Sequence, residues 1–187
     1  MSRWEPDAQG RLAQAALELY SERGFDQTTV AEIAQRAGLT ERTFFRYFAD
    51  KREVLFWGEG VLHNVFVTAV AGADEALSPI DAVAAGLDAA GEMFAGRYDH
   101  ARRRQAVIAA NTALQERELI KLASLAAGVG DALRNRGVSD IAADLAAEAG
   151  IAVFKVAFER WISGTREQDL SGVIRAALEE MRTLTAS

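Results

Sequence analysis

One segment constrains the fold of this chain more than any other: residues 28–54, which read TTVAEIAQRAGLTERTFFRYFADKREV. Thr29 can cap a helix, and Glu32 stands three residues later, where it completes a capping box. Apolar residues then recur at helical spacing until Gly38, which supplies the left-handed residue that ends a helix. Thr40 caps a second short helix. Two short helices joined by a glycine turn predict a helix-turn-helix unit, whose second helix enters the major groove of DNA.

The same segment resembles a known protein family. Residues 38–54 follow the pattern G-L-T-x-x-T-F-F-R-Y-F-x-x-K-x-x-L/V, which is similar to the recognition segment of the TetR family of bacterial repressors. Residues 15–34 contain Ala-Ala-Leu, Gly-Phe and Thr-Thr-Val-Ala-Glu-Ile-Ala, which match the first two helices of that family. The resemblance covers roughly residues 8–56, and ERTFFRYFADKREVL at 41–55 resembles actinobacterial members.

The resemblance implies a ligand-responsive transcriptional repressor. Such a protein binds a palindromic operator in double-stranded DNA as a homodimer, with one recognition helix in each half-site, and a small-molecule effector releases it. A minority of the family activates transcription, so a TetR-type activator is one alternative. A helical scaffold or small-molecule-binding protein that does not bind an operator is the other.

The sequence as a whole predicts an all-α protein. Its two prolines stand where helices can begin, and no strand-like alternation of apolar and polar residues persists. We expect about nine helices in two domains: a helix-turn-helix DNA-binding domain at 1–56, and a helical regulatory and dimerisation domain at 57–187. The helix-turn-helix should cover about 29–48. The other expected helices cover about 6–23, 51–70, 79–98, 101–110, 113–136, 140–162 and 169–184.

Composition excludes several classes of protein. The chain has no cysteine, which removes disulfides and thiolate metal sites. It has no apolar run long enough to span a membrane, and its N-terminus, MSRWEPDAQG, does not read as a signal peptide, so we expect a cytoplasmic protein. There is no phosphate-binding glycine loop, and His63 and His100 lack metal-ligand spacing. We therefore expect no catalysis, no metal and no cofactor.

The net charge of −6 does not exclude DNA binding, because the charge is unevenly distributed. Residues 1–56 hold eight Lys and Arg against nine Asp and Glu, so the head is nearly neutral. Four of those basic residues lie between Arg42 and Arg52. The local field at a contact surface matters more than the total charge.

By their places in the family motif, several head residues are expected to contact DNA. Arg42 is the expected base reader, because a guanidinium can bind O6 and N7 of guanine together. Phe45 stands where the family often has tyrosine, so it either packs against a sugar or thymine methyl group or is buried. Glu41 either accepts a bond from cytosine or serves only in capping and solvation. The expected contacts are Thr29, Thr40, Tyr47 and Lys51 with phosphates, together with Glu41, Arg42, Thr43, Phe45 and Arg46.

Residues 151–158, IAVFKVAF, are apolar on nearly all helical faces, with Lys155 as the one charge. A helix that is apolar all round must be covered all round. A second copy of the chain is the simplest cover, and in the family the last two helices form a four-helix dimer bundle; a core helix of a monomer is the alternative. The expected dimer-interface residues are Ile151, Phe154, Phe158, Ile174, Leu178 and Met181.

The resemblance also implies a small-molecule pocket in the C-terminal domain. Large side chains lie on the helices expected to surround it, which favours a largely apolar effector, although such residues are also typical of plain core. The candidate ligand-binding residues are Phe66, Met93, Phe94, Tyr98, Asn111, Phe154, Phe158 and Trp161.

Residues 57–60 read Trp-Gly-Glu-Gly, where the head is expected to meet the second domain. Each glycine inside a helix costs about 1 kcal/mol relative to alanine. The pair predicts either a compliant joint or a place where close packing requires a missing side chain.

Overall fold

The computed structural model describes residues 7–186, and the regular elements within this range are all helices. The prediction of an all-α fold with about nine helices is therefore confirmed. The elements are α1 (Ala8–Arg23), α2 (Val30–Arg36), α3 (Glu41–Tyr47), the 3₁₀ helix η1 (Glu53–Phe56), α4 (Glu59–Ala71), α5 (Pro79–Met93), α6 (Tyr98–Ala109), α7 (Thr112–Asn135), α8 (Asp140–Ser163) and α9 (Leu170–Thr185).

Two expected helices differ from the observed ones. The stretch expected at 51–70 is divided into η1 and α4, with a turn at Trp57 and Gly58 between them. The helix expected at 79–98 ends at Met93, because Gly96 adopts a left-handed φ of 71°, and α6 then begins at Tyr98. In both places glycine lowers the cost of leaving the helical conformation.

The glycines beside the first break do not serve close packing. A Cβ added to Gly58 or Gly60 would meet no atom within 4 Å. The close-packing explanation is therefore wrong, and a compliant joint between η1 and α4 is the remaining interpretation.

The chain divides into two compact units. Unit 1 comprises Met1–Glu59 and Arg103–Glu118, and unit 2 comprises Gly60–Arg102 and Leu119–Ser187. The end of α6 and the start of α7 thus belong to the same unit as the helix-turn-helix. This association was not predicted from the sequence.

Unit 1 has its own apolar core, to which the corner between α6 and α7 contributes. Ile108 and Leu114 are fully buried in one cluster with Leu12 of α1 and Phe44 of α3. Arg104 of α6 donates from Nε to the carbonyl oxygen of Leu55 at 2.8 Å. It also pairs with Glu59 at 2.8 Å and with Glu118 at 3.5 Å. These contacts fix η1 to the α6–α7 corner.

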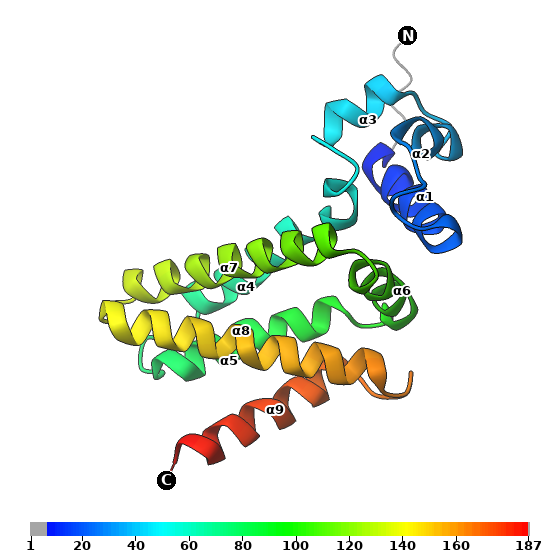
Figure 1. Cartoon of the computed structure of the whole chain (residues 1–187). Helices are drawn as coiled ribbons and strands as arrows, with labels where there is room; N and C mark the ends of the chain where they lie inside the picture. The colour runs from blue at the N-terminus through cyan, green and yellow to red at the C-terminus, as the bar shows by residue number, and fades with distance from the viewer. Residues whose placement is uncertain (1–6, 187) are drawn as a thin grey trace. The chain divides into compact units, whose positions relative to one another are not determined.

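Unit 2 is built around α5, which packs against both α8 and α9, while α8 packs against α9 (Figure 1). Two glycines allow close approach between its helices. A Cβ on Gly150 of α8 would lie 2.3 Å from Cγ1 of Val83 on α5, and a Cβ on Gly86 of α5 would lie 2.4 Å from the ring of Phe66 on α4. Phe66 is fully buried, and its ring fills the space that Gly86 leaves.

Contrary to the expectation from the sequence, the stretch Glu53–Ala71 is by length and composition alone long and apolar enough to cross a membrane. In the structure this stretch is interrupted at Trp57 and Gly58, and both Phe56 and Phe66 are buried in the protein. These are the features of helices that carry core residues, and the stretch gives no support to membrane insertion.

Candidate functional site

The start of α2 is fixed by the predicted capping box. The hydroxyl of Thr29 accepts a bond from the backbone N–H of Glu32 at 3.3 Å, and the Glu32 carboxylate accepts from the backbone N–H of Thr29 at 2.9 Å. Arg23 pairs with the same carboxylate at 2.8 Å. These donors, the Thr29 backbone foremost, lower the pKa of Glu32 below its usual value.

This capping box predicts an acid-sensitive contribution to stability. Because the folded-state pKa of Glu32 is lowered, the contribution is fully present above the ordinary carboxyl pKa of about 4.5 and is lost as pH falls through the lowered value. Between about pH 6 and about pH 3, the free energy of unfolding should therefore fall further for the wild type than for Glu32→Gln, measured by urea unfolding. Equal pH dependence in the two proteins would contradict the assignment.

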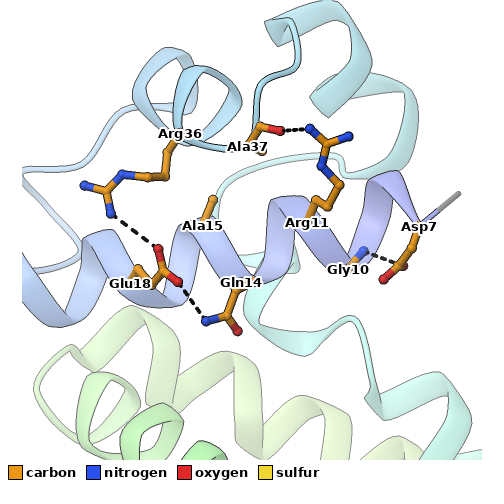
Figure 2. Close-up of a pocket in the computed structure, with 8 residues that line it drawn as sticks. All are labelled: Asp7, Gly10, Arg11, Gln14, Ala15, Glu18, Arg36 and Ala37. Carbon is orange, nitrogen blue, oxygen red and sulfur yellow. Dashed lines mark hydrogen bonds and ion pairs between the residues drawn. The ribbon is translucent and has the colours of Figure 1, made fainter. Parts of the chain in front are cut away.

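The turn between α2 and α3 also has the predicted conformation. Gly38 adopts a φ of 68°, and the N–H of Leu39 donates to the carbonyl oxygen of Ala34 at 2.8 Å. Arg11 of α1 donates to the carbonyl oxygen of Ala37, which ties α1 to the end of α2 (Figure 2).

A surface pocket of about 430 Å³ lies at this tie between α1 and α2. Figure 2 shows that its polar side chains bond to neighbours: Arg36 pairs with Glu18 at 3.4 Å, and Gln14 donates to Glu18 at 2.8 Å. The pocket thus contains matched charges, and we assign no ligand to it. The lining residues are Asp7, Gly10, Arg11, Gln14, Ala15, Glu18, Arg36 and Ala37.

The recognition helix α3 separates a buried face from an exposed one. Phe44 and Phe48 are buried, as expected for core residues. Thr40 caps the helix by accepting a bond from the N–H of Thr43 at 3.2 Å. The remaining expected contacts on this helix are exposed: Glu41, Arg42, Phe45, Arg46 and Tyr47.

Phe45 is not part of the core. Its side chain is 56% exposed, and its ring meets the ring of Phe44 edge-on at 5.5 Å between centroids. The explanation of Phe45 as a buried residue is therefore wrong, and an exposed aromatic ring lies on α3.

The two arginines of α3 differ in their surroundings. The guanidinium of Arg46 lies 4.7 Å from the centre of the Tyr47 ring and donates to its hydroxyl at 2.9 Å. Among the described residues, Arg42 has no hydrogen bond or ion pair. Arg42 is thus available to a ligand, whereas Arg46 is held by its neighbour.

Lys51, expected as a phosphate anchor, lies against the turn between α1 and α2. Its ammonium donates to the carbonyl oxygens of Phe25 at 2.9 Å and Thr28 at 3.0 Å, and it lies 4.3 Å from the centre of the Phe25 ring. The hydroxyl of Tyr20 donates to the carbonyl oxygen of Lys51 at 2.6 Å. Burial raises the pKa of Tyr20, which keeps this phenol a neutral donor.

Most of the expected effector-binding residues meet in unit 2 as a cluster of aromatic rings. Neighbouring rings lie 5.4–6.2 Å apart between centroids, and the members are Phe94, Tyr98, Phe154, Phe158 and Trp161. The polar atoms of the cluster are bonded within the chain: Tyr98 donates to the carbonyl oxygen of Gly164 at 2.8 Å, and Trp161 to that of Gln168 at 2.9 Å. Met93 packs beside this cluster, in the same core.

Two expected effector-binding residues lie elsewhere. Asn111 belongs to unit 1, where its side chain accepts a bond from the N–H of Leu114 at 3.3 Å and lies 3.4 Å from Asp26. It caps the start of α7, so its expected place in the pocket is wrong. Phe66 packs against Gly86 and has no ring contact with the aromatic cluster among the described residues.

The expected dimer residues also need correction. Ile151, Phe154, Ile174 and Leu178 are buried within their own chain, in the unit where α5, α8 and α9 pack against one another. Phe158 and Met181 are half-buried. An apolar sequence shows that a helix is covered, but it does not show which faces are covered by the same chain. The large apolar side chains left exposed on these two helices are Ile141, Leu145, Val156 and Leu184.

Family models match both parts of the chain. The model described as bacterial regulatory proteins of the tetR family matches residues 12–56, and the model described as the MftR C-terminal domain matches residues 77–186, more than half of the chain. The chain belongs to the TetR family. The resemblance in residues 8–56 and the predicted fold are thereby confirmed.

Relatives in this family are regulators of transcription. TcmR of Streptomyces glaucescens is 38% identical over 60 residues, which are 32% of this chain and 26% of TcmR. MftR of Mycobacterium tuberculosis is 38% identical over 52 residues, 28% of this chain and 26% of MftR. The aligned part therefore spans about a quarter of each relative. Both come from actinobacteria, in line with the resemblance to such members.

Solved structures share the fold. FadR of Bacillus subtilis, in complex with stearoyl-CoA, has a TM-score of 0.64 at 19% identity, covering 91% of this chain and 95% of FadR. The SmeT–triclosan complex has a TM-score of 0.65 at 19% identity, covering 95% of this chain and 90% of SmeT. Among residues 7–186, no group of His, Asp and Glu side chains is placed to hold a metal ion.

Proposed function

We propose that a homodimer of this TetR-family chain binds a palindromic operator in the cytoplasm, represses transcription and is released by an apolar effector. The exposed face of α3 carries the proposal. Arg42 and Arg46 project from the side of α3 opposite Phe44 and Phe48, which anchor it in the core of unit 1. The domain boundary near residue 56 stays part of the proposal, with residues 103–118 joined to the head.

The proposed roles follow from the surroundings of each side chain. Arg42 reads guanine, and Arg46 reaches a base or phosphate in the orientation that Tyr47 gives it. Thr29, Thr40 and Tyr47 contact phosphates. The exposed ring of Phe45 packs on a sugar or a thymine methyl group. Glu41 and Thr43 complete the contact set of α3.

A dimer of this chain is proposed to use the exposed faces of α8 and α9. Ile141, Leu145 and Val156 recur on one face of α8, and Leu184 extends the apolar surface to α9. Exposed apolar side chains gathered on two neighbouring helices are typical of a protein–protein interface. The half-buried Phe158 and Met181 keep their proposed places at its edge.

The effector is proposed to bind at the aromatic cluster of unit 2. Every ring in that cluster presents an apolar surface, since the hydroxyl of Tyr98 and the indole N–H of Trp161 are bonded to backbone carbonyls. FadR was solved with stearoyl-CoA and SmeT with triclosan, both of which have large apolar parts. The shared fold and the ring cluster together support an apolar effector.

The Arg42→Ala variant tests the proposed operator binding. A duplex is first selected by the wild-type protein from a random pool, and its dissociation constant is measured by fluorescence anisotropy. The loss of one bidentate base contact should weaken the binding free energy by about 1–3 kcal/mol and relax the sequence preference at one base position. Arg52→Ala is the matched control. Arg52 pairs with Asp50 at 2.7 Å, so its replacement should leave the affinity for the duplex unchanged. Unchanged binding by Arg42→Ala would remove it from the base-reading set.

Two alternatives have distinct outcomes. A protein that retains no duplex from the pool is a helical ligand-binding or scaffold protein. A protein that binds its duplex and increases transcription from a reporter promoter is a TetR-type activator.

A further inference from the structure

Most cationic side chains of the DNA-binding head are already engaged within unit 1. Each of the following has a carboxylate or carbonyl partner inside the chain: Arg11 with the Ala37 carbonyl, Arg23 with Glu32 at 2.8 Å, Arg36 with Glu22 at 3.0 Å, Lys51 with two carbonyls, and Arg52 with Asp50 at 2.7 Å. Arg42 and Arg46, both on α3, are the two cations of residues 7–56 outside this set. Residues 7–56 are therefore poor in cations that can meet a phosphate.

Lys51 is the member of this set that a family motif assigns to DNA. An ammonium has three N–H donors, and two of them are directed at the carbonyls of Phe25 and Thr28. The ring of Phe25 lies under the same group at 4.3 Å, which adds a cation–π attraction. A phosphate could bind the ammonium of Lys51 only by displacing these contacts.

The two carbonyls belong to the turn that leads into α2. In this turn Thr28 is fully buried, and its hydroxyl donates to the carbonyl oxygen of Gly24 at 2.9 Å. The next residue is Thr29, the cap of α2 and a proposed phosphate contact. Tyr20 of α1 holds the backbone of Lys51 through its carbonyl. The lysine thus connects α1, the turn and the end of the helix-turn-helix.

We propose that Lys51 is a positioning residue: it fixes the turn that presents Thr29 to the operator, and it does not itself neutralise a phosphate. This inference rests on the proposed operator binding. Among residues 7–56, it assigns the cationic contacts with DNA to Arg42 and Arg46 of α3.

The dependence of affinity on salt separates positioning from phosphate contact. Each phosphate neutralised by a cation contributes about −0.9 to the slope of log K against log salt concentration. If Lys51 contacted one phosphate in each protomer, its removal would make the slope of the dimer shallower by about 2. A positioning residue changes the affinity at every salt concentration and leaves the slope unchanged.

The experiment measures operator affinity over a salt series for the wild type, Lys51→Met and Lys51→Gln, with the duplex selected by the wild type. Lys51→Met keeps the length of the side chain without its donors and should weaken binding about tenfold at constant slope, an effect of ordinary hydrogen-bond size. Lys51→Gln is neutral but can donate to a carbonyl, so it should recover part of that loss. It also provides the slope measurement if Lys51→Met does not fold.

A double-mutant cycle with Thr29→Ala tests whether Lys51 acts through the α2 cap. In the Lys51→Met background, Thr29→Ala should cost less operator affinity than in the wild type, whereas a general loss of stability would leave the two effects additive. A slope shallower by about 2, additive effects, or unchanged affinity in both Lys51 variants would each overturn the inference. Failure of the wild type to retain any duplex would instead overturn the proposed function.

Discussion

The Gly86→Ala variant is expected to be less stable than the wild type by about 1–3 kcal/mol, because it overpacks a close helix contact in unit 2. The new Cβ would lie 2.4 Å from Cδ1 and Cε1 of Phe66 and 2.8 Å from Cγ2 of Val70. Both neighbours are fully buried, so neither side chain can move into solvent. Relief requires α4 and α5 to separate, which loosens packing along both helices.

Urea unfolding followed by circular dichroism measures this change, and two further variants control it. Gly60→Ala makes the same substitution where the Cβ meets no atom within 4 Å, so it should be neutral or stabilising by up to about 1 kcal/mol. In a Phe66→Leu background the obstructing ring is absent, and Gly86→Ala should then cost less than it does in the wild type. Equal costs in the two backgrounds would show that the ring of Phe66 is not the obstacle.

The Leu145→Arg variant is expected to dissociate the dimer and to weaken operator binding at least about a hundredfold. Leu145 is 67% exposed at the centre of the apolar face of α8, between Ile141 and Val156. In the proposed interface the substitution would bury an unpaired guanidinium in each protomer, at a cost of about 3–5 kcal/mol per charge. A monomer offers one recognition helix, so operator affinity falls with the dimer.

Sedimentation equilibrium gives the molecular mass, and anisotropy on the selected duplex gives the affinity. Leu119→Arg is the matched control: Leu119 is 57% exposed on α7, which is not one of the two helices of the proposed face, and its replacement should leave a dimer with unchanged affinity. A Leu145→Arg protein that stays dimeric at micromolar concentration would refute the interface on α8.

The structural features that can be predicted reliably from the sequence are local ones. The capping box of Thr29 and Glu32, the left-handed Gly38 and the cap at Thr40 each depend on neighbours within three or four residues. Such features can be predicted because the residues that satisfy the backbone donors and acceptors lie in the same short stretch. The core positions Phe44 and Phe48 follow for the same reason, from helical spacing alone.

The features that the sequence did not predict are set by residues distant along the chain. Lys51 is held by carbonyls more than twenty positions earlier, and Asn111 lies beside Asp26. The inward faces of α8 and α9 were assigned to a second copy because their apolar pattern does not identify α5 as the covering element. In each instance the local pattern indicates the type of side chain and does not identify its partner within the chain.

The contribution of the α6–α7 corner to the core of unit 1 limits how far the DNA-binding part is autonomous. A fragment that stopped at Glu59 would lack Val107, Ile108 and Leu114, three apolar side chains that complete that core. The apolar side chains that these three residues cover would be exposed to solvent. The carbonyl oxygen of Leu55 would also lose the hydrogen bond that it accepts from Arg104. We therefore expect that the proposed DNA-binding part does not fold as a free-standing module.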